Sequence, residues 1–176
     1  MFNQQKYFEA LGYYELAAHF ASSEPSAWNN LGNNYLMLND LTKALECFQK
    51  VIALDKNDFN CLVNIGNCYA TWNQPDSAII YYLKAAVVDM KSIVPLKSLA
   101  EIYKRKQHFD SALIFLNQCL FLDPKNVQIL TDVTMIYLLQ NKMEKGLECL
   151  KRVLNIDPMN QMAQMIMLKL KEEGKI

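Results

Sequence analysis

The chain has 176 residues, of which 52% are hydrophobic and 20% are charged, a size and composition that fit one folded domain or one short repeat array. Its 18 basic and 18 acidic residues cancel, which argues against a nucleic-acid partner because such proteins usually carry a basic excess. No stretch approaches the roughly 18 unbroken apolar residues of a membrane span, so we expect no membrane partner.

Apolar residues recur at i, i+3, i+4 and i+7 spacing along most of the chain, which predicts a succession of amphipathic helices. The first predicted helix covers residues 5–20, and two helices follow in each of the next segments. Leu31 and Tyr35, for example, line one face of the second helix. A last helix is predicted over residues 161–173. The sequence therefore predicts an all-α protein.

The sequence repeats itself in steps of 34 residues. Gly32 recurs as Gly66, and a tyrosine recurs in four copies, at Tyr35, Tyr69, Tyr103 and Tyr137. A small residue recurs in phase at Ala44, Ala78, Ala112 and Gly146, and a bulky residue follows it at Phe48, Tyr82, Leu116 and Leu150. A glycine inside a helix costs about 1 kcal/mol relative to alanine, so we interpret Gly32 and Gly66 as points of close helix approach.

This pattern resembles the tetratricopeptide repeat, in which Trp, Leu-Gly, Tyr, Ala, Phe and Pro recur with a period of 34. The first full copy carries Trp28, Leu31, Gly32, Tyr35, Ala44 and Phe48, with Lys56 in place of the proline. The resemblance implies a right-handed superhelical solenoid of antiparallel helix pairs. It also implies a concave groove, lined by the first helix of each repeat, that binds a peptide segment of a partner protein.

The phase of the repeat divides the chain into six segments. Full repeats are predicted at 25–58, 59–92, 93–126 and 127–160, and a C-terminal capping helix at 161–176. Residues 1–24 are interpreted as the second helix of a partial repeat, because Ala10 matches Ala44 and Tyr14 matches Phe48. This first helix has no helix before it to pair with, and its apolar residues are Tyr7, Phe8, Leu11 and Tyr14. A homo-oligomer formed through this helix is therefore an alternative function.

The sequence holds five cysteines, an odd number, at Cys47, Cys61, Cys68, Cys119 and Cys149. No two of them form a C-x-x-C pair, so we interpret them as reduced thiols that pack as small apolar side chains. A redox pair of Cys61 and Cys68 is the alternative. Residues 1–20 lack the unbroken apolar core of a signal peptide, and the cytoplasm is the predicted location.

Motifs for catalysis and metal binding are missing from the sequence. The two histidines, His19 and His108, stand in no zinc-binding spacing, and no Walker loop, G-x-S-x-G or G-x-G-x-x-G occurs. We therefore expect no enzyme, no metal site and no cofactor. The methionines of the tail, Met159, Met162, Met165 and Met167, are interpreted as core packing, with an adaptable binding surface as the alternative.

Asparagines cluster on the first helices of the first two repeats, although asparagine is a mediocre helix former. The predicted peptide-binding residues are Asn29, Asn30, Asn33, Asn64 and Asn67. Asn30 and Asn64 share one phase of the repeat, as do Asn33 and Asn67. An asparagine side chain offers both a donor and an acceptor, so it can hold a peptide backbone. Hydrogen bonds between helices of the array are the alternative.

The third repeat replaces these asparagines with charged residues. Its inner stripe is predicted to carry Lys97, Glu101, Lys104 and Arg105. Such a cationic cluster on a neutral chain favours a partner with acidic side chains or a free carboxylate. A solvated helix face is the alternative.

Some family members hold the carboxyl terminus of heat-shock chaperones in a clamp of lysines, asparagines and an arginine. Asn33 and Asn64 match this clamp, but Asn29, Val94 and Ser98 stand where it needs Lys, Lys and Arg. Chaperone-tail binding is therefore disfavoured. The predicted function is a non-catalytic scaffold that binds another protein or peptide, and the alternatives are a self-associating module or a secretion or co-chaperone type of adaptor.

Overall fold

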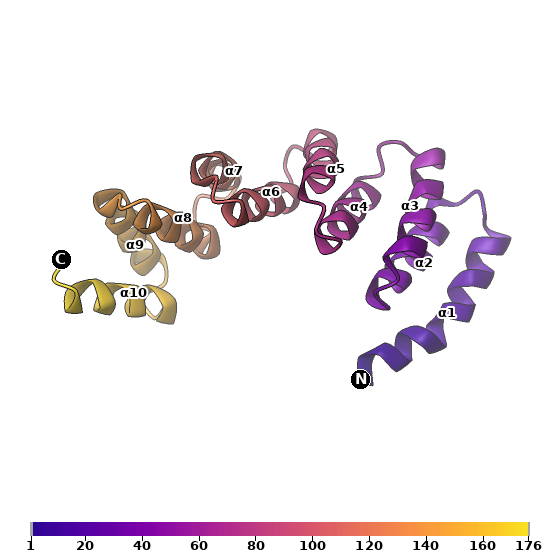
Figure 1. Cartoon of the computed structure of the whole chain (residues 1–176), viewed down its shortest axis with the longest axis horizontal. Helices are drawn as coiled ribbons and strands as arrows, with labels where there is room; N and C mark the ends of the chain where they lie inside the picture. The colour runs from indigo at the N-terminus through magenta and orange to yellow at the C-terminus, as the bar shows by residue number, and fades with distance from the viewer. Residues whose placement is uncertain (1, 176) are drawn as a thin grey trace. The chain divides into compact units, whose positions relative to one another are not determined.

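The computed structural model describes residues 2–175, with the side chains from residue 5 onward. In this range the chain forms ten α-helices and no strand, which confirms the all-α prediction (Figure 1). The helices are α1 (Phe2–Phe20), α2 (Pro25–Met37), α3 (Leu41–Leu54), α4 (Phe59–Thr71), α5 (Pro75–Val88), α6 (Val94–Arg105), α7 (Phe109–Leu122), α8 (Val127–Leu139), α9 (Met143–Ile156) and α10 (Gln161–Glu172).

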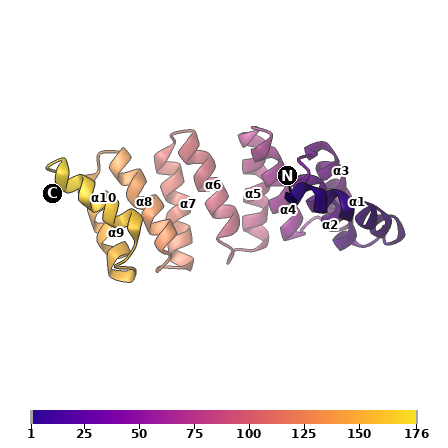
Figure 2. The same ribbon diagram turned by 90° about the horizontal axis from the view of Figure 1, so that it is seen from below.

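The helices fall into two compact units, Met1–Pro95 and Leu96–Ile176. In the first unit α1 packs against α2, α2 pairs with α3, and α4 pairs with α5, while α3 also contacts α4. In the second unit α7 packs against α8, α8 pairs with α9, and α10 packs against α9 (Figure 2). Each unit is thus built from helix pairs in the manner of a helical-repeat solenoid.

Polar side chains fix where several helices begin. The residues just before α3, α4, α8 and α10 each accept a hydrogen bond of 2.7–3.2 Å from the backbone N–H three positions later. These caps are Asp40, Asp58, Asn126 and Asn160. A cap of this kind satisfies a backbone donor that the first turn of a helix leaves free.

The turn that follows the first helix of each pair places one residue in the left-handed region, with φ between 56° and 61°. The residues are Asn39, Asn73, Gln107 and Asn141, which stand 34 positions apart. A left-handed residue at this point ends a helix by redirecting the chain, and asparagine tolerates the conformation better than most residues. The repeat in the sequence is therefore also a repeat in backbone conformation.

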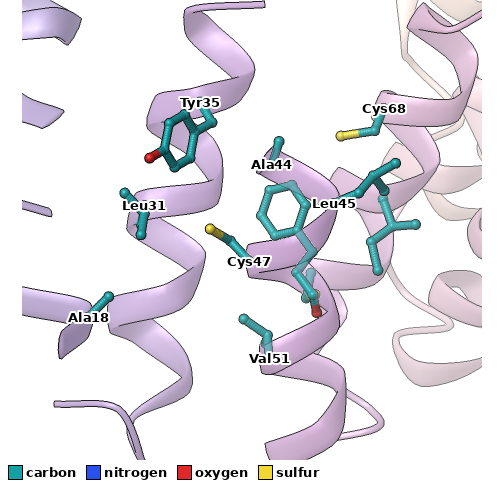
Figure 3. Packing of buried hydrophobic residues seen from close by; sticks show 11 residues of the cluster. Ala18, Leu31, Tyr35, Ala44, Leu45, Cys47, Val51 and Cys68 are labelled. Carbon is teal, nitrogen blue, oxygen red and sulfur yellow. The ribbon is translucent and has the colours of Figure 1, made fainter. Parts of the chain in front are cut away.

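The core of the first unit lies where α2, α3 and α4 meet. Phe48 is fully buried there, beside Leu31, Tyr35 and Ile65. Figure 3 shows the sulfur of Cys47 of α3 directed toward α2, the helix that carries Leu31 and Tyr35. In the second unit a separate apolar cluster joins α8, α9 and α10. Each helix pair is thus held by burial of apolar side chains.

Gly32 of α2 and Gly66 of α4 lie where an aromatic ring of the partner helix comes closest. A Cβ atom on Gly32 would lie 2.6 Å from Cε1 of Phe48, and one on Gly66 would lie 2.6 Å from Cε1 of Tyr82. No side chain fits in that space. The predicted close approach is confirmed, and the group that needs the space is the aromatic ring.

The five cysteines are free and buried, which confirms their interpretation as apolar packing residues. Burial raises the pKa of the Cys61 thiol to about 12 and the pKa of the Cys68 thiol to about 11. Both thiols therefore stay protonated near neutral pH, and the alternative of a redox pair is disfavoured because the thiolate is the reactive form. The Sγ atom of Cys61 instead donates a hydrogen bond of 3.3 Å to the backbone oxygen of Phe48.

The tail helix differs from the prediction. Ala163 and Leu170 are buried against the second unit, but Met159, Met162 and Met165 are exposed by 79%, 55% and 67%. The interpretation of these three methionines as core packing is wrong. In the part of the chain that the structure describes, no later helix packs on this face of α10, so its apolar residues face solvent.

Candidate functional site

A cleft of about 700 Å³ lies between α2 and α4 in the first unit. Four of the predicted binding residues line it: Asn29, Asn30, Asn33 and Asn64. Asn60 joins them, and Glu24 and Asp58 are the charged residues of the wall. We call this site the asparagine cleft. Its wall is polar and contains carboxylates but no lysine or arginine.

Asn33 and Asn64 lie on facing helices of the asparagine cleft and bind each other. The Nδ2 atom of Asn64 donates a hydrogen bond of 2.7 Å to Oδ1 of Asn33. This bond uses one N–H of Asn64 and one lone pair of Asn33, so each side chain keeps further donors and acceptors for a ligand in the cleft. Asn30 lies beside them and is exposed. The predicted alternative of bonding between helices is thus seen for this pair, and it leaves room for a ligand bond.

Asn29 has an acceptor that no group of the protein satisfies. Its Nδ2 atom donates to Oδ2 of Asp58 at 3.2 Å, and Asp58 is in turn fixed by a 2.7 Å hydrogen bond from the backbone N–H of Cys61. The Oδ1 atom of Asn29 is buried and has no hydrogen-bond partner among the described residues. A buried acceptor without a partner carries a free-energy cost, so Asn29 is held in this position at the expense of stability.

Asn67 stands apart from the other four asparagines. Its Oδ1 atom accepts a hydrogen bond of 2.7 Å from the hydroxyl of Tyr82, and it does not line the asparagine cleft. The side chain is half-buried between α4 and α5. The contact that the structure gives this residue is therefore one that joins the two helices of a pair.

The charged residues predicted in the third repeat form an ion-paired cluster in the second unit. Glu101 accepts from both Lys104 and Arg105, the latter at 3.1 Å. Partial burial opposes ionisation of Glu101, but the hydrogen bonds from Lys104 and Arg105 outweigh it and lower its pKa. Lys97 is exposed, and no ion pair to it is found among the described residues. Lys97 is thus the cation of this cluster with the most freedom to bind a partner.

Asp132 is a member of this cluster that the sequence interpretation missed. Burial raises the pKa of its carboxyl group, Lys104 and Lys97 oppose the shift, and Glu101 adds to it. Asp132 stands at the same phase as Asn30 and Asn64, three and two repeats later. The repeat alone could have identified it. With two carboxylates among three cations, the cluster is less positive than its lysines and arginine alone indicate.

Within residues 2–175 no helix is both long enough and apolar enough to cross a membrane. In the same residues no three side chains of His, Cys, Asp or Glu come close enough together to hold a metal ion.

Models of the tetratricopeptide repeat match residues 25–58, 59–86 and 98–126 of the chain. None of the curated proteins compared with the chain matches it. The matches to the tetratricopeptide repeat models include copies on both sides of the boundary between the two units.

Solved structures of helical-repeat proteins are similar to most of the chain, over 88–92% of its length. A crystal structure of MamA gives a TM-score of 0.79 at 14% identity, and the match covers 89% of this chain and 91% of MamA. A MamA fragment from Desulfovibrio magneticus RS-1 gives 0.76 at 17% identity, with 88% of each chain covered. YrrB, described as a TPR protein with an unusual peptide-binding site, gives 0.73 at 20% identity, with 92% and 84% covered. At these identities the likeness shows the fold.

Proposed function

Because the chain belongs to the tetratricopeptide repeat family, whose members serve as protein–protein interaction scaffolds, we propose that it holds an extended peptide segment of a partner protein in the asparagine cleft. The observation that carries this proposal is the convergence of Asn29, Asn30, Asn33 and Asn64 on one cleft. An extended peptide presents alternating N–H and C=O groups, and carboxamides can bond to both.

Asn30 and Asn64 supply the main contacts to the peptide, because both line the cleft and Asn30 is exposed. Asn29 supports the wall of the cleft through its hydrogen bond to Asp58. We assign Asn67 a supporting role, because its oxygen already binds Tyr82.

We propose that acidic side chains of the partner bind the charged cluster of the second unit. Lys97 makes the main contact, and Lys104 and Arg105 contribute when they exchange their ion pairs with Glu101 for ion pairs with the partner. These exposed ion pairs are weak, so exchange of Glu101 for a partner carboxylate costs little. We further propose a cytoplasmic location, because all five thiols are free.

The test is an unbiased pull-down with the intact chain and with the double variant Asn30→Ala/Asn64→Ala. Asn117→Ala, an exposed asparagine on α7, is the matched control. Each lost contact should weaken binding of the mapped peptide by about 1 kcal/mol, read by isothermal titration calorimetry. Equal affinity of the double variant and the control variant would remove the asparagine cleft from the mechanism.

Self-association through α1 is a second candidate, and one observation favours it. Tyr13 and Phe20 of α1 are exposed by 78% and 83%, and Phe8 by 63%. Leu11 and Tyr14, two of the four apolar residues named for this interface from the sequence, pack against the core of the first unit instead. Light scattering over a range of concentrations tests the idea, because a constant monomer mass contradicts it.

A further inference from the structure

The outer face of α5 carries three exposed apolar residues. Ile80, Leu83 and Val87 are exposed by 54%, 44% and 76%. At the same positions α9 carries Glu148, Lys151 and Asn155, α3 carries Glu46, Gln49 and Ala53, and α7 carries Ile114, Asn117 and Phe121. Among these four helices α5 alone is apolar at all three positions. Single exposed apolar residues are ordinary, but a continuous apolar stripe on an exposed face is typical of a surface that a partner covers.

This face borders a groove of about 780 Å³ between α3 and α5. Leu83, Val87 and Val88 of α5 form one wall, and Ile52 of α3 forms the other. Most of the side chains that line the groove are apolar, and the buried Leu62 of α4 is among them. The groove is separate from the asparagine cleft, with which it shares no lining residue.

The charges at the edge of the groove have one sign. Lys56 and Lys84 line it, and no aspartate or glutamate does. The Nζ atom of Lys84 lies 4.9 Å from the centre of the Tyr81 ring, which holds this charge at the groove. An occupant with carboxylates beside its apolar residues complements this edge, whereas a basic occupant is repelled.

We propose that the α3–α5 groove is a second docking surface, which takes an amphipathic helix of a partner protein with acidic residues flanking its apolar stripe. Ile80, Leu83 and Val87 follow i, i+3, i+7 spacing, so α5 presents a ridge along which another helix packs. A helix laid in the groove covers the exposed apolar residues and places its carboxylates at Lys56 and Lys84. This surface is independent of the peptide bound in the asparagine cleft.

The test selects helical peptides from a displayed random library on the full chain. We expect the enriched peptides to share apolar residues at i, i+3 or i+4, and i+7, with Asp or Glu beside them. The variant Leu83→Gln/Val87→Asn takes the residues that Gln49 and Asn155 supply at these positions, and it should weaken the selected peptides at least about tenfold. Ile114→Glu, an exposed residue of α7 at the phase of Ile80, is the matched control and should change binding less than about twofold.

Charge reversal gives a second readout that does not depend on apolar substitutions. Lys56→Glu/Lys84→Glu should weaken acidic peptides and turn the preference toward basic ones. Asn30→Ala/Asn64→Ala should leave these peptides bound, so the two surfaces are tested separately. The proposal is overturned if no peptide is enriched, if the enriched peptides are not acidic, or if they bind the Leu83→Gln/Val87→Asn variant equally well. Self-association lost in that variant assigns the groove to a second copy and also overturns the proposal.

Discussion

The hydroxyl of Tyr35 donates a hydrogen bond of 2.6 Å to the carboxylate of Glu15, and this bond joins α2 to α1. Burial and the neighbouring carboxylate both raise the pKa of Tyr35, so the phenol stays protonated and remains a donor. Tyr35 is the tyrosine of the repeat pattern, and Glu15 belongs to the helix that precedes the first full repeat. The bond therefore secures the helix that the sequence left without a partner.

Tyr35→Phe removes only this hydroxyl and keeps the ring in the core. A hydrogen bond to a charged group contributes about 1.5–3 kcal/mol, so the free energy of unfolding should fall by up to that amount. Urea denaturation followed by circular dichroism measures the change. Tyr13→Phe is the control, because Tyr13 is 78% exposed and should show no effect. Equal stability of the two variants would mean that the Tyr35–Glu15 bond contributes nothing.

Gly66→Ala and Gly12→Ala should have opposite effects on stability. The added Cβ at Gly66 meets the buried ring of Tyr82, and such overpacking costs about 1–3 kcal/mol. At Gly12 nothing lies within 4 Å, so alanine should stabilise α1 by about 0.5–1 kcal/mol. Thermal melts of the two variants show directly whether each substitution raises or lowers the melting temperature. A Gly66→Ala variant as stable as the parent chain contradicts the close approach of α4 and α5.

Asn34→Cys should stabilise the protein. Asn34 is 3% exposed, and neither polar atom of its side chain has a hydrogen-bond partner among the described residues. The residues at the same phase of the later repeats are Cys68, Ile102 and Ile136, all buried and apolar. Removal of an unsatisfied buried amide should raise the free energy of unfolding by about 1–3 kcal/mol, measured by urea denaturation.

The control for this substitution is Asn34→Asp, which puts a charge in the same place and should destabilise the protein strongly. If Asn34→Cys instead lowers stability, the amide is hydrogen-bonded in solution, and Asn34 belongs with the functional asparagines rather than with the core.

Asp132→Asn should stabilise the folded state in a manner that depends on pH. The raised pKa of Asp132 means that folding disfavours its ionised form, so the stability of the parent chain falls as pH rises from the ordinary aspartate pKa through the raised one. The Asp132→Asn variant does not lose this stability. Its free energy of unfolding should exceed that of the parent chain by the full amount at pH 7.5, and the two should be equal near pH 3, where the aspartic acid is protonated in both the folded and the unfolded state.

Urea denaturation of both chains at a series of pH values measures the difference. An advantage that stays constant with pH would show that burial of the carboxylate is not its cause. Gln128, which hydrogen-bonds Asp132, should be left unchanged in this comparison.

The 34-residue step predicted most of the fold because each of its marker residues has a local physical cause. Gly32 and Gly66 recur where a ring packs, and the asparagines at 39, 73 and 141 recur where the backbone turns left-handed. The ring packing and the left-handed turn both arise within one helix pair, so they recur with the repeat and can be recognised in the sequence. The asparagine cleft followed only partly from the same phase: Asn30 and Asn64 occupy equivalent positions and both line it, whereas Asn67, the equivalent of Asn33, does not.

What the sequence did not predict depends on contacts between elements. The bond between Asn33 and Asn64, and the free acceptor of Asn29, follow from the distance between α2 and α4. The pairing of Glu101 with Lys104 and Arg105 could have been predicted, because they lie three and four residues apart on one helix. The exposure of Met162 could not be predicted, because the spacing of apolar residues does not say which of them another helix covers.

The buried cysteines are natural probes of local unfolding. Every full repeat carries at least one: Cys47, then Cys61 and Cys68, then Cys119, then Cys149. A thiol shielded by its own helix pair is alkylated only when that pair separates, and stacked repeats open in cooperative pieces rather than all at once. The order in which the natural thiols are modified by a neutral alkylating reagent therefore ranks the repeats by local stability, without any engineered label.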